Sequence, residues 1–252
     1  MATGVFLSIL LLAFLCEYMD SSLGMGYGTT LAPVLLLFGF APLQIVPVIL
    51  ISEFLSGFSA ALLHHSFKNV DLKLGSRDFK IAAIMSLCSV VGVIAAVFVA
   101  VNIPKVVLKS IIGIIVMSMG IILIAMRGRH VRFSWTKITF LGLVAAFNKG
   151  LSGGGYGPLT TSGQVLSGVP TKSAIGITSL AESITCVAGV ITYLLTKGKI
   201  DLVLAPPLLI GAMLSVPLAT LSVKLIDTEK IKFLIGVLTA ILGAVTLIDI
   251  FI

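Results

Sequence analysis

The sequence predicts an all-α, polytopic integral membrane protein made of two homologous repeats. Three observations predict this fold class: the apolar composition, a series of segments long enough to cross a bilayer, and two similar glycine-rich interruptions. Of 252 residues, 58% are hydrophobic and only 11% are charged, with a mean hydropathy of +1.19. Soluble domains carry about a quarter charged residues, and a domain of this size has too little interior for so many apolar side chains. We therefore expect the lipid bilayer to be the main solvent of the chain.

The first apolar run is expected to be a retained helix rather than a cleaved signal. It lacks a basic start, and no small-residue cleavage site precedes another span. The net charge of +7 falls in short loops between apolar runs, as in cytoplasmic loops of membrane proteins, so it does not indicate a nucleic-acid partner. Cys16, Cys88 and Cys186 lie inside apolar segments without Cys-x-x-Cys spacing. We expect no disulfide, no metal site and no cofactor.

Six segments are long and apolar enough to be ordinary membrane-spanning helices. About 20 residues, rising 1.5 Å each, cross the ~30 Å hydrocarbon layer. The predicted spans are residues 43–65, 81–101, 104–126, 170–196, 202–224 and 231–252.

Two further regions, residues 4–40 and 138–168, are too long for one straight helix. The first is interrupted by the glycine-rich residues 20–28, and the second by residues 148–158, which end in Pro158. Clustered glycine does not sustain a helix interior. Each region is therefore predicted to form two half-helices that flank a break.

The two interruptions resemble each other, which indicates an internal duplication. A shift of 129 positions superimposes seven identical residues, and a shift of 123 superimposes Lys109 and Gly113 on Lys232 and Gly236. We expect a first repeat at 1–127, a basic cytoplasmic linker at 128–137 and a second repeat at 138–252. The residues matched by the first shift are Gly24, Gly26, Tyr27, Gly28, Leu37, Gly39 and Glu53 with Gly153, Gly155, Tyr156, Gly157, Leu166, Gly168 and Glu182.

The relative orientation of the repeats stays open at the level of sequence. Two basic clusters, at 68–80 and 127–137, are separated by two complete spans, so both are expected on the cytoplasmic side. If each broken region crosses once, the repeats are parallel; if it enters and returns, or crosses twice, they are inverted. Lys197 and Lys199 favour the first arrangement, whereas Lys224, Lys230 and Lys232 favour the second.

The breaks are the predicted binding site. Non-helical backbone at membrane depth is tolerated only against protein or a water-filled cavity, and breaks at corresponding places of two repeats point to a transport site near the midplane. Each following half-helix begins with free N–H donors and a positive dipole end, which suits an anion. Close helix packing by small residues is the competing interpretation. The candidate contacts are Tyr27, Gly28, Thr29 and Thr30, with Gly155, Tyr156, Gly157, Thr160, Thr161 and Ser162.

Three longer polar side chains lie near these half-helices. Lys149 precedes the second break, with Asp20 at the matching position of the first. Its ammonium is expected to pair with an anionic substrate, to pair with Asp20, or to reach the membrane interface. Gln44 and Lys172 begin the next spans and either rim a cavity or anchor the helices at the interface.

Two glutamates are candidates for proton coupling. Glu53 and Glu182 each lie ten or more residues inside a long apolar span, where an ionised carboxylate is costly unless it is paired or faces water. Desolvation favours the neutral form of such a group, so protonation is available for coupling. A structural role as hydrogen-bonded glutamic acids is the alternative. Glu17, at the end of the first half-helix, is a weaker candidate of the same kind.

An enzymatic function is not expected. Residues 150–153 match a Gly-x-Ser-Gly pattern like that of intramembrane serine proteases, which need a histidine base on a later helix. All three histidines, His64, His65 and His130, precede Ser152 and lie in or beside the basic loops. No catalytic dyad in that order is available.

The repeat layout, the Gly-x-Gly-Tyr-Gly breaks and the run Gly-Val-Pro-Thr-Lys-Ser-Ala-Ile-Gly-Ile-Thr-Ser at 168–179 resemble the TauE/SafE-type sulfite exporter family, also called TSUP. The resemblance spans nearly the whole chain. It implies transport of sulfur-containing anions such as sulfite or sulfoacetate across a bacterial or archaeal inner membrane. The family's glycine-rich motif falls on Gly24, Gly26 and Gly28 and on Gly153, Gly155 and Gly157. The first motif departs from the family pattern at Met25 and Thr29, and the second motif matches that pattern better. This difference favours the second half for anion binding.

These observations together predict a secondary transporter that exports a small sulfur-containing anion, held between the two breaks. A homodimer is compatible with the sequence. A passive anion channel is one alternative, and a non-transporting membrane assembly or sulfur-relay component is another.

Overall fold

The computed structural model describes residues 3–125, 134–223 and 228–248. Ten helices form within these ranges, and no strand is present in them. In chain order they are α1 (Thr3–Leu23), α2 (Tyr27–Leu37), α3 (Pro42–Ser66), α4 (Arg77–Asn102), α5 (Lys105–Ala125), α6 (Trp135–Ser152), α7 (Tyr156–Leu166), α8 (Thr171–Lys197), α9 (Ala205–Ser222) and α10 (Thr228–Ile248).

The helices confirm the all-α membrane fold. Six of them, α1, α3, α4, α5, α8 and α9, have the length and apolar composition of membrane spans. Both broken regions form the expected pairs, α1 with α2 and α6 with α7. Helix α6 begins at Trp135, so the last three residues of the expected linker are helical. Residues 128–133 of that linker lie outside the described ranges, as do the ends of three expected spans, residues 126, 224 and 249–252.

The matched glycines hold backbone conformations that other residues rarely adopt. Gly24 has φ +71° and Gly153 has φ +76°, while Gly26 and Gly155 have φ +135° and +81°. A side chain is disfavoured at such angles, so these positions end one half-helix and begin the next. Gly39 and Gly168, with φ +87° and +83°, do the same after α2 and α7.

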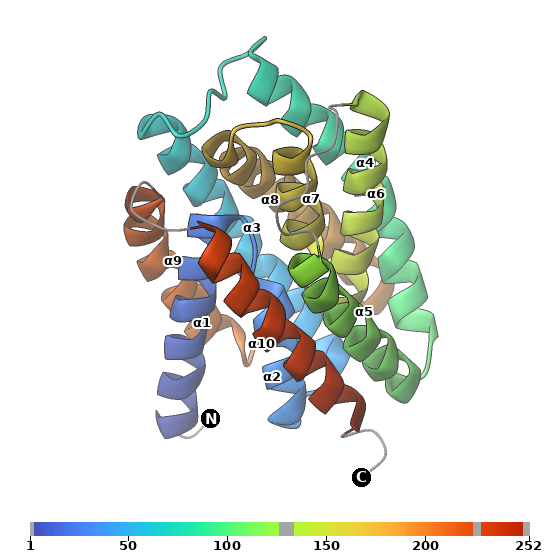
Figure 1. Ribbon diagram of the computed structural model, residues 1–252. Coiled ribbons are helices and arrows are strands. Elements are labelled where there is room, and N and C mark those ends of the chain that lie inside the picture. Colours follow the sequence, from blue (N-terminus) through green and yellow to red (C-terminus); the bar gives the residue numbers. More distant parts are fainter. Residues whose placement is uncertain (1–2, 126–133, 224–227, 249–252) are drawn as a thin grey trace.

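The two halves of the chain run in opposite directions (Figure 1). Helix α1 begins at the end of the molecule where both termini lie, and the chain reverses at the first break, so that α2 returns to that end. Helix α6 begins at the opposite end, and α7 returns to it. Each broken region therefore enters and returns, which is the inverted arrangement of the two left open by the sequence.

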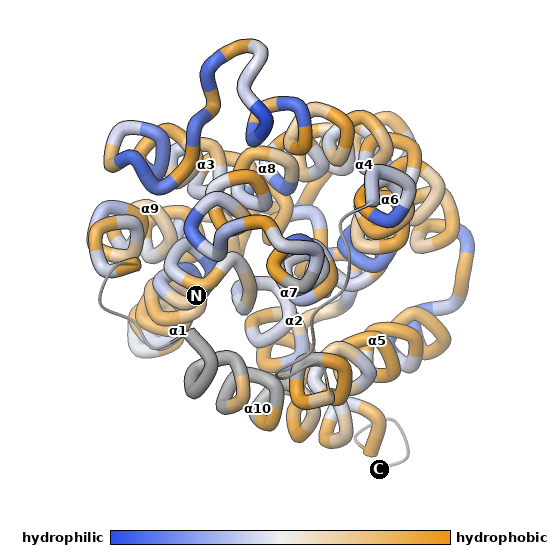
Figure 2. The backbone as a smooth tube through the Cα atoms, turned by 45° about the horizontal axis from the view of Figure 1, so that its top comes forward, coloured by the Kyte–Doolittle hydropathy of each residue, from blue (hydrophilic) through white to orange (hydrophobic). Residues whose placement is uncertain are grey.

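The half-helices α2 and α7 lie at the centre of the molecule, and the other helices surround them (Figure 2). Helix α1 packs on α9, and in the corresponding place α6 packs on α4. Helices α3 and α8 pack on each other, as do α5 and α10. This exchange of equivalent partners is what a two-fold relation between inverted halves produces, while the duplication itself stays a prediction.

Two hydrogen bonds occupy corresponding places in the two inverted halves. His64 Nε2 donates to the carbonyl oxygen of Ser21 over 2.8 Å, and the Tyr193 hydroxyl donates to that of Gly150 over 3.0 Å. The 129-residue shift carries His64 to Tyr193 and Ser21 to Gly150. A long helix is thus tied to the end of a half-helix in the same way in each half.

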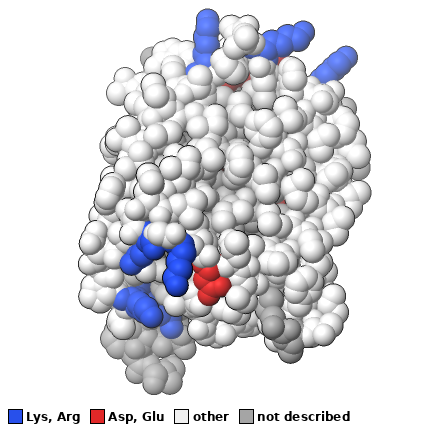
Figure 3. Space-filling model, turned by 180° about the vertical axis from the view of Figure 1, so that it is seen from behind, with Lys and Arg blue, Asp and Glu red and all other residues white. Residues whose placement is uncertain are grey.

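The molecular surface has the pattern of a protein embedded in lipid. On the face seen in Figure 3, Lys and Arg side chains gather toward two ends, with a band free of them between. Large apolar side chains such as Leu87, Phe98 and Leu195 are exposed, as expected where lipid rather than water is the neighbour. The end that carries the 67–76 loop also holds the start of α6 (Figure 1). Because basic residues flank both, we call it the cytoplasmic end.

Candidate functional site

The two breaks lie directly against each other at the centre of the molecule. A methyl group added to Gly28 would collide with the backbone of Gly153 and Gly154. The reciprocal contact lies on the other side, where a methyl on Gly157 would collide with Gly24 and Met25. Each half-helix therefore starts in contact with the break of the opposite repeat, and glycine is required because the backbones approach so closely.

Two matched tyrosines anchor these half-helices in the surrounding helices. Tyr27, the first residue of α2, shares a 2.8 Å hydrogen bond with Ser52 of α3. Tyr156, the first residue of α7, shares one of 2.9 Å with Ser89 of α4. Both tyrosine side chains are fully buried. Their predicted place at the breaks agrees with the structure, but both hydroxyls are occupied by protein partners.

A buried ion triad lies beside the breaks. The Lys149 side chain, 1% exposed, is near the end of α6, and its Nζ donates to Glu182 Oε1 of α8 over 2.7 Å. The same ammonium pairs with Glu53 Oε2 of α3. The two glutamates are at matched positions of the duplication, so one lysine joins both repeats. Of the three alternatives for Lys149, the reach to the membrane interface does not agree with the structure, because its side chain is buried between two carboxylates.

The charges of the triad do not balance when all three groups are ionised. One ammonium faces two carboxylates, and buried ions are costly unless each is compensated. Asp20, at the end of α1, adds a third carboxyl group in this region, and its Oδ1 accepts the backbone N–H of Tyr27 over 3.2 Å. Among the described residues, the triad with Asp20 thus holds three carboxyl groups and one ammonium.

Glu17 forms a separate buried carboxyl site on α1. Its Oε1 accepts from the Ser21 hydroxyl over 2.6 Å, and its Oε2 accepts from the Ser56 hydroxyl over 3.0 Å. Both oxygens thus accept from neutral hydroxyl donors. The 129-residue shift places Ala146 at the matching position, so this carboxyl belongs to one half alone.

The start of α7 carries a hydroxyl network that reaches the first break. Thr161 Oγ1 donates to the Gly24 carbonyl over 2.7 Å and lies 2.9 Å from Thr178 Oγ1 of α8. Gln164 Nε2 also donates to Thr178, over 3.0 Å. Thr160, Thr161 and Ser162 are all buried, so the hydroxyls predicted for the second half-helix do lie in the interior.

Several buried oxygens near the breaks have no hydrogen-bond partner. They include the hydroxyls of Thr29 and Thr30 on α2, Glu53 Oε1 on α3 and Gln164 Oε1 on α7. A buried polar atom without a partner costs about 1–3 kcal/mol. Such atoms are expected where water or a polar solute is received.

The two other candidate residues lie away from the centre. Gln44 begins α3 at the end that holds the termini, where its Nε2 donates to Asp201 Oδ2 over 2.8 Å. Lys172 is exposed at the start of α8. Neither touches the breaks in the described structure, so a direct substrate contact at the centre is not supported for them.

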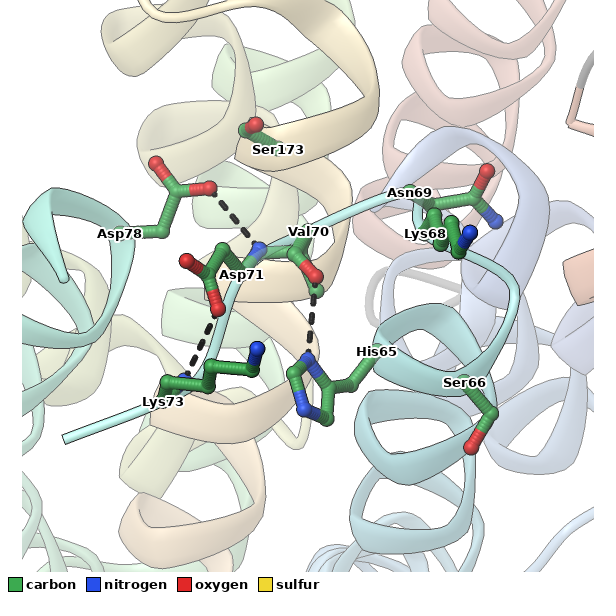
Figure 4. A pocket seen from close by; sticks show the side chains of 9 residues that line it. All are labelled: His65, Ser66, Lys68, Asn69, Val70, Asp71, Lys73, Asp78 and Ser173. Carbon is green, nitrogen blue, oxygen red and sulfur yellow. Dashed lines mark hydrogen bonds between the residues drawn. The ribbon is translucent and has the colours of Figure 1, made fainter.

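An open cavity of about 540 Å³ lies at the cytoplasmic end (Figure 4). Its walls are the end of α3, the following loop, and the starts of α4 and α8. Asn69 connects it to the interior, because its Nδ2 lies 3.1 Å from His64 Nδ1 and donates to the Thr220 carbonyl over 3.1 Å. The lining residues are His65, Ser66, Lys68, Asn69, Val70, Asp71, Lys73, Asp78 and Ser173.

The Gly-x-Ser-Gly segment has a structural role in the second break. Ser152 Oγ donates to the Asn148 carbonyl over 2.8 Å and accepts from Gly154 N–H over 3.1 Å. His64 bonds to the carbonyl oxygen of Ser21 and His65 to that of Val70, and His130 lies outside the described residues. Among the described residues, no group of three His, Cys, Asp or Glu side chains is placed to hold a metal.

Sequence reasoning placed Lys149, Glu53 and Glu182 on the candidate list but did not pair them. Their contact joins α6, α3 and α8, and such a contact is not visible in one sequence. A signal was nevertheless present, because a lysine in an apolar segment requires a counter-ion at its own depth. The matched glutamates, both near the middle of long spans, are carboxylates of that kind.

A ring of apolar helices around two central half-helices, with an ion triad in its interior, is the arrangement of a membrane transporter. Residues 9–246 match the family described as Sulfite exporter TauE/SafE, and the chain belongs to that family. It is also 26% identical over 251 residues to the "Probable membrane transporter protein YtnM" of Bacillus subtilis (strain 168), covering 94% of this chain and 81% of the relative. No solved structure matches the chain. The protein is thus a multi-pass membrane transporter, and its relatives are transporters rather than enzymes.

Proposed function

We propose that the protein exports a small sulfur-containing anion, of the sulfite or organosulfonate class, and that transport is coupled to protons at the Lys149 triad. The carrying observation is that one buried ammonium is shared by two buried glutamates beside the contact of the two breaks. The substrate class comes from the family to which the chain belongs.

The half-helices supply the first part of the anion site. Helices α2 and α7 each begin at a break, and the first backbone N–H groups of a helix have no partner within the helix. The unpaired hydroxyls of Thr29 and Thr30 lie in the first turn of α2. Backbone amides and hydroxyls suit the oxygen atoms of an oxyanion.

The triad supplies the second part. With both glutamates ionised, the charge of Lys149 is fully used, and a substrate anion would be repelled. Protonation of Glu53 or Glu182 removes one negative charge and leaves the ammonium partly free to attract the anion. Proton binding and anion binding therefore favour the same form of the centre, which is thermodynamic linkage between two ligands.

Flux measurements in proteoliposomes test this proposal. Purified protein is reconstituted, sulfite or sulfoacetate is loaded on one side, and efflux is followed with and without an imposed pH gradient. Acidification of the loading side is expected to accelerate efflux several-fold. A Glu182→Gln variant, which carries a permanently neutral side chain, is expected to lose that acceleration.

Each other outcome of the flux assay rejects a defined part of the proposal. A pH gradient that leaves wild-type flux unchanged, with substrate never concentrated against its own gradient, indicates a passive anion channel. Equal flux of sulfite and simple carboxylates rejects the substrate class. Retained flux in a Lys149→Ala, Glu182→Gln double variant rejects the triad as the coupling site.

A further inference from the structure

The two ends of the molecule carry equivalent turns after equivalent helices. The loop that follows α3 contains Asp71, whose Oδ1 accepts the backbone N–H of Lys73 over 3.1 Å. The loop that follows α8 contains Asp201, whose Oδ1 accepts the backbone N–H of Val203 over 3.1 Å. Each aspartate thus caps the residue two positions later. The two turns follow corresponding helices of the two halves, although the 129-residue shift carries Asp71 to Ile200, one position before Asp201.

At the end that holds the termini, this turn is closed onto a helix start. Gln44 is the third residue of α3, and its Nε2 donates to the second carboxylate oxygen of Asp201 over 2.8 Å. Its other side-chain atom, Oε1, accepts the backbone N–H of Ala41 over 3.0 Å. Both ends of the Gln44 amide are therefore fixed, which holds the α8–α9 loop against the start of α3.

At the cytoplasmic end, the equivalent junction is open. The 129-residue shift carries Gln44 to Ser173, which is the third residue of α8. Ser173 and Asp71 both line the cavity of about 540 Å³, and Figure 4 shows Ser173 across it from the loop. Within the described residues, no hydrogen bond joins the side chains of Ser173 and Asp71. The Gln44–Asp201 junction is thus closed by a hydrogen bond, whereas the corresponding Ser173–Asp71 junction borders an open cavity.

We infer that Gln44 and Asp201 form the outer gate of the transport path, that the Ser173–Asp71 cavity is its cytoplasmic mouth, and that the two junctions close in alternation. The inference rests on the proposed function, because it assigns the entry route of the same substrate anion. Inverted repeats commonly alternate between two mirror-related openings around one central site.

The composition of the cavity suits an anion that arrives from the cytoplasm. Lys68 and Lys73 line it, and cationic side chains at a mouth raise the local concentration of anions. Both carboxylates in the lining are engaged by backbone N–H groups, since Asp78 Oδ2 accepts from Asp71 N over 3.1 Å and Asp71 Oδ1 accepts from Lys73 N. Their charge is thus partly compensated within the loop.

The closing contact is weak enough to be opened in each cycle. A solvent-exposed hydrogen bond to a carboxylate contributes little net stability because water competes for both partners. At the cytoplasmic end, Lys68, two residues after the end of α3, holds a left-handed backbone conformation with φ +60°. Non-glycine residues in that region are strained, and such strain is typical of segments that change conformation.

Paired cysteine variants test the alternation. The background is Cys88→Ala, because Cys16 and Cys186 are buried and buried thiols react poorly. The outer pair is Gln44→Cys with Asp201→Cys, and the inner pair is Asp71→Cys with Ser173→Cys. A short bifunctional thiol reagent, reversible by reductant, is applied to the protein in proteoliposomes.

The resting protein is expected to cross-link at the outer pair and not across the inner cavity. Outer cross-linking is expected to lower sulfoacetate efflux at least tenfold and to leave unchanged the rise in unfolding temperature that sulfoacetate produces, with recovery of efflux after reduction. Sulfoacetate is expected to raise inner cross-linking, and it replaces sulfite here because sulfite cleaves disulfides. The matched controls are the single-cysteine variants, whose efflux the reagent should not change.

Two results overturn the inference. One is undiminished sulfoacetate efflux through the cross-linked outer pair, and the other is equal cross-linking of both pairs in the resting protein. Failure of the proposed function gives a different result, since the Cys88→Ala parent would then move neither sulfite nor sulfoacetate. Cross-linking yields remain readable in that case, because they are measured on the protein itself.

Discussion

At the scale of single residues, the ammonium of Lys149 determines the chemistry of the interior. Its side chain is 1% exposed and contacts carboxylates from two other helices. A buried ion pair contributes little to stability by itself, but removal of one partner leaves an uncompensated charge that is strongly destabilising. Lys149 is therefore expected to matter for stability and for transport by separate physical routes.

Replacement of Lys149 by methionine is expected to destabilise the protein by about 3–5 kcal/mol, because two carboxylates lose their counter-ion. The measurement is thermal unfolding in detergent. Adding Glu53→Gln and Glu182→Gln to Lys149→Met is expected to restore most of the stability while sulfite efflux stays absent.

The triple variant separates the two roles. Glutamine keeps the shape of glutamate without its charge, so stability recovers if the cost is electrostatic. A triple variant that remains as unstable as Lys149→Met would show that Lys149 acts by packing. Restored efflux in the triple variant would exclude the triad from transport.

The pH dependence of transport is expected to come from the interior and not from the outer gate. The backbone N–H of Val203 and the Gln44 side chain hold the pKa of Asp201 below its usual range, which is near ~3.9. A carboxylate whose pKa is lowered in the folded protein contributes stability that is present above its usual pKa. That stability is lost only as the pH falls through the lowered pKa. Between pH 5 and 8 Asp201 therefore stays ionised, and its contact with Gln44 does not change with pH.

An Asp201→Asn variant is accordingly expected to show an efflux–pH curve of unchanged shape between pH 5 and 8, whatever its amplitude. The comparison is with Glu182→Gln, whose curve should flatten. A shifted curve for Asp201→Asn would place a transport proton at the outer gate.

At the scale of elements, the two broken helices were the part of the fold most accessible to prediction. Glycine clusters cannot continue a helix, and four of the matched glycines at the breaks, Gly24, Gly26, Gly153 and Gly155, have positive φ angles for that reason. The start of α6 was less predictable. Residues 135–137 are helical, although the sequence placed Trp135 and Lys137 in the linker. Aromatic and basic residues at the membrane interface occur both in linkers and in the first turn of a helix.

The contact between the elements could not be predicted from periodicity. Gly28 and Gly157 are required by the backbone of the opposite repeat, which a one-dimensional pattern does not reveal. The same holds for the direction of the halves, since loop charges favoured both arrangements. The Gln44–Asp201 bond likewise joins residues 157 positions apart, so sequence alone left Gln44 either at the rim of a cavity or as an interfacial anchor.

Substitution of Gly28 by alanine is expected to destabilise the protein by more than the ~1–3 kcal/mol typical of overpacking, because the obstacle is backbone that cannot rotate away. Gly157→Ala should behave alike for the reciprocal reason. Gly4→Ala is the matched control, since nothing lies within 4 Å of the added carbon. Thermal unfolding in detergent is the measurement, and equal stability of Gly28→Ala and Gly4→Ala would contradict the close contact of the breaks.

At the scale of the whole molecule, the inverted arrangement assigns each loop to a side. Leu74, in the loop after α3, is 87% exposed, and Leu202, in the loop after α8, is 55% exposed. The two loops lie at opposite ends of the helix bundle. The basic clusters assign the first of them to the cytoplasm.

Single-cysteine labelling tests this topology in a Cys88→Ala background. A membrane-impermeant maleimide applied to intact cells is expected to label Leu202→Cys and to leave Leu74→Cys unlabelled. Inside-out vesicles should reverse the pattern, and the parent without an added cysteine is the control. Labelling of both positions from one side would support parallel repeats and reject the inverted arrangement.

The reciprocal contact of the two breaks also bears on how the chain is assembled. During synthesis, α1 and α2 leave the ribosome long before residues 153–157 exist, so the first break meets no protein surface on one side. Unpaired peptide groups are not tolerated in hydrocarbon. We therefore expect the α1–α2 hairpin to stay near the aqueous boundary, or in the insertion machinery, until the second break has been synthesised. The core of the molecule is then completed only after most of the chain has been made.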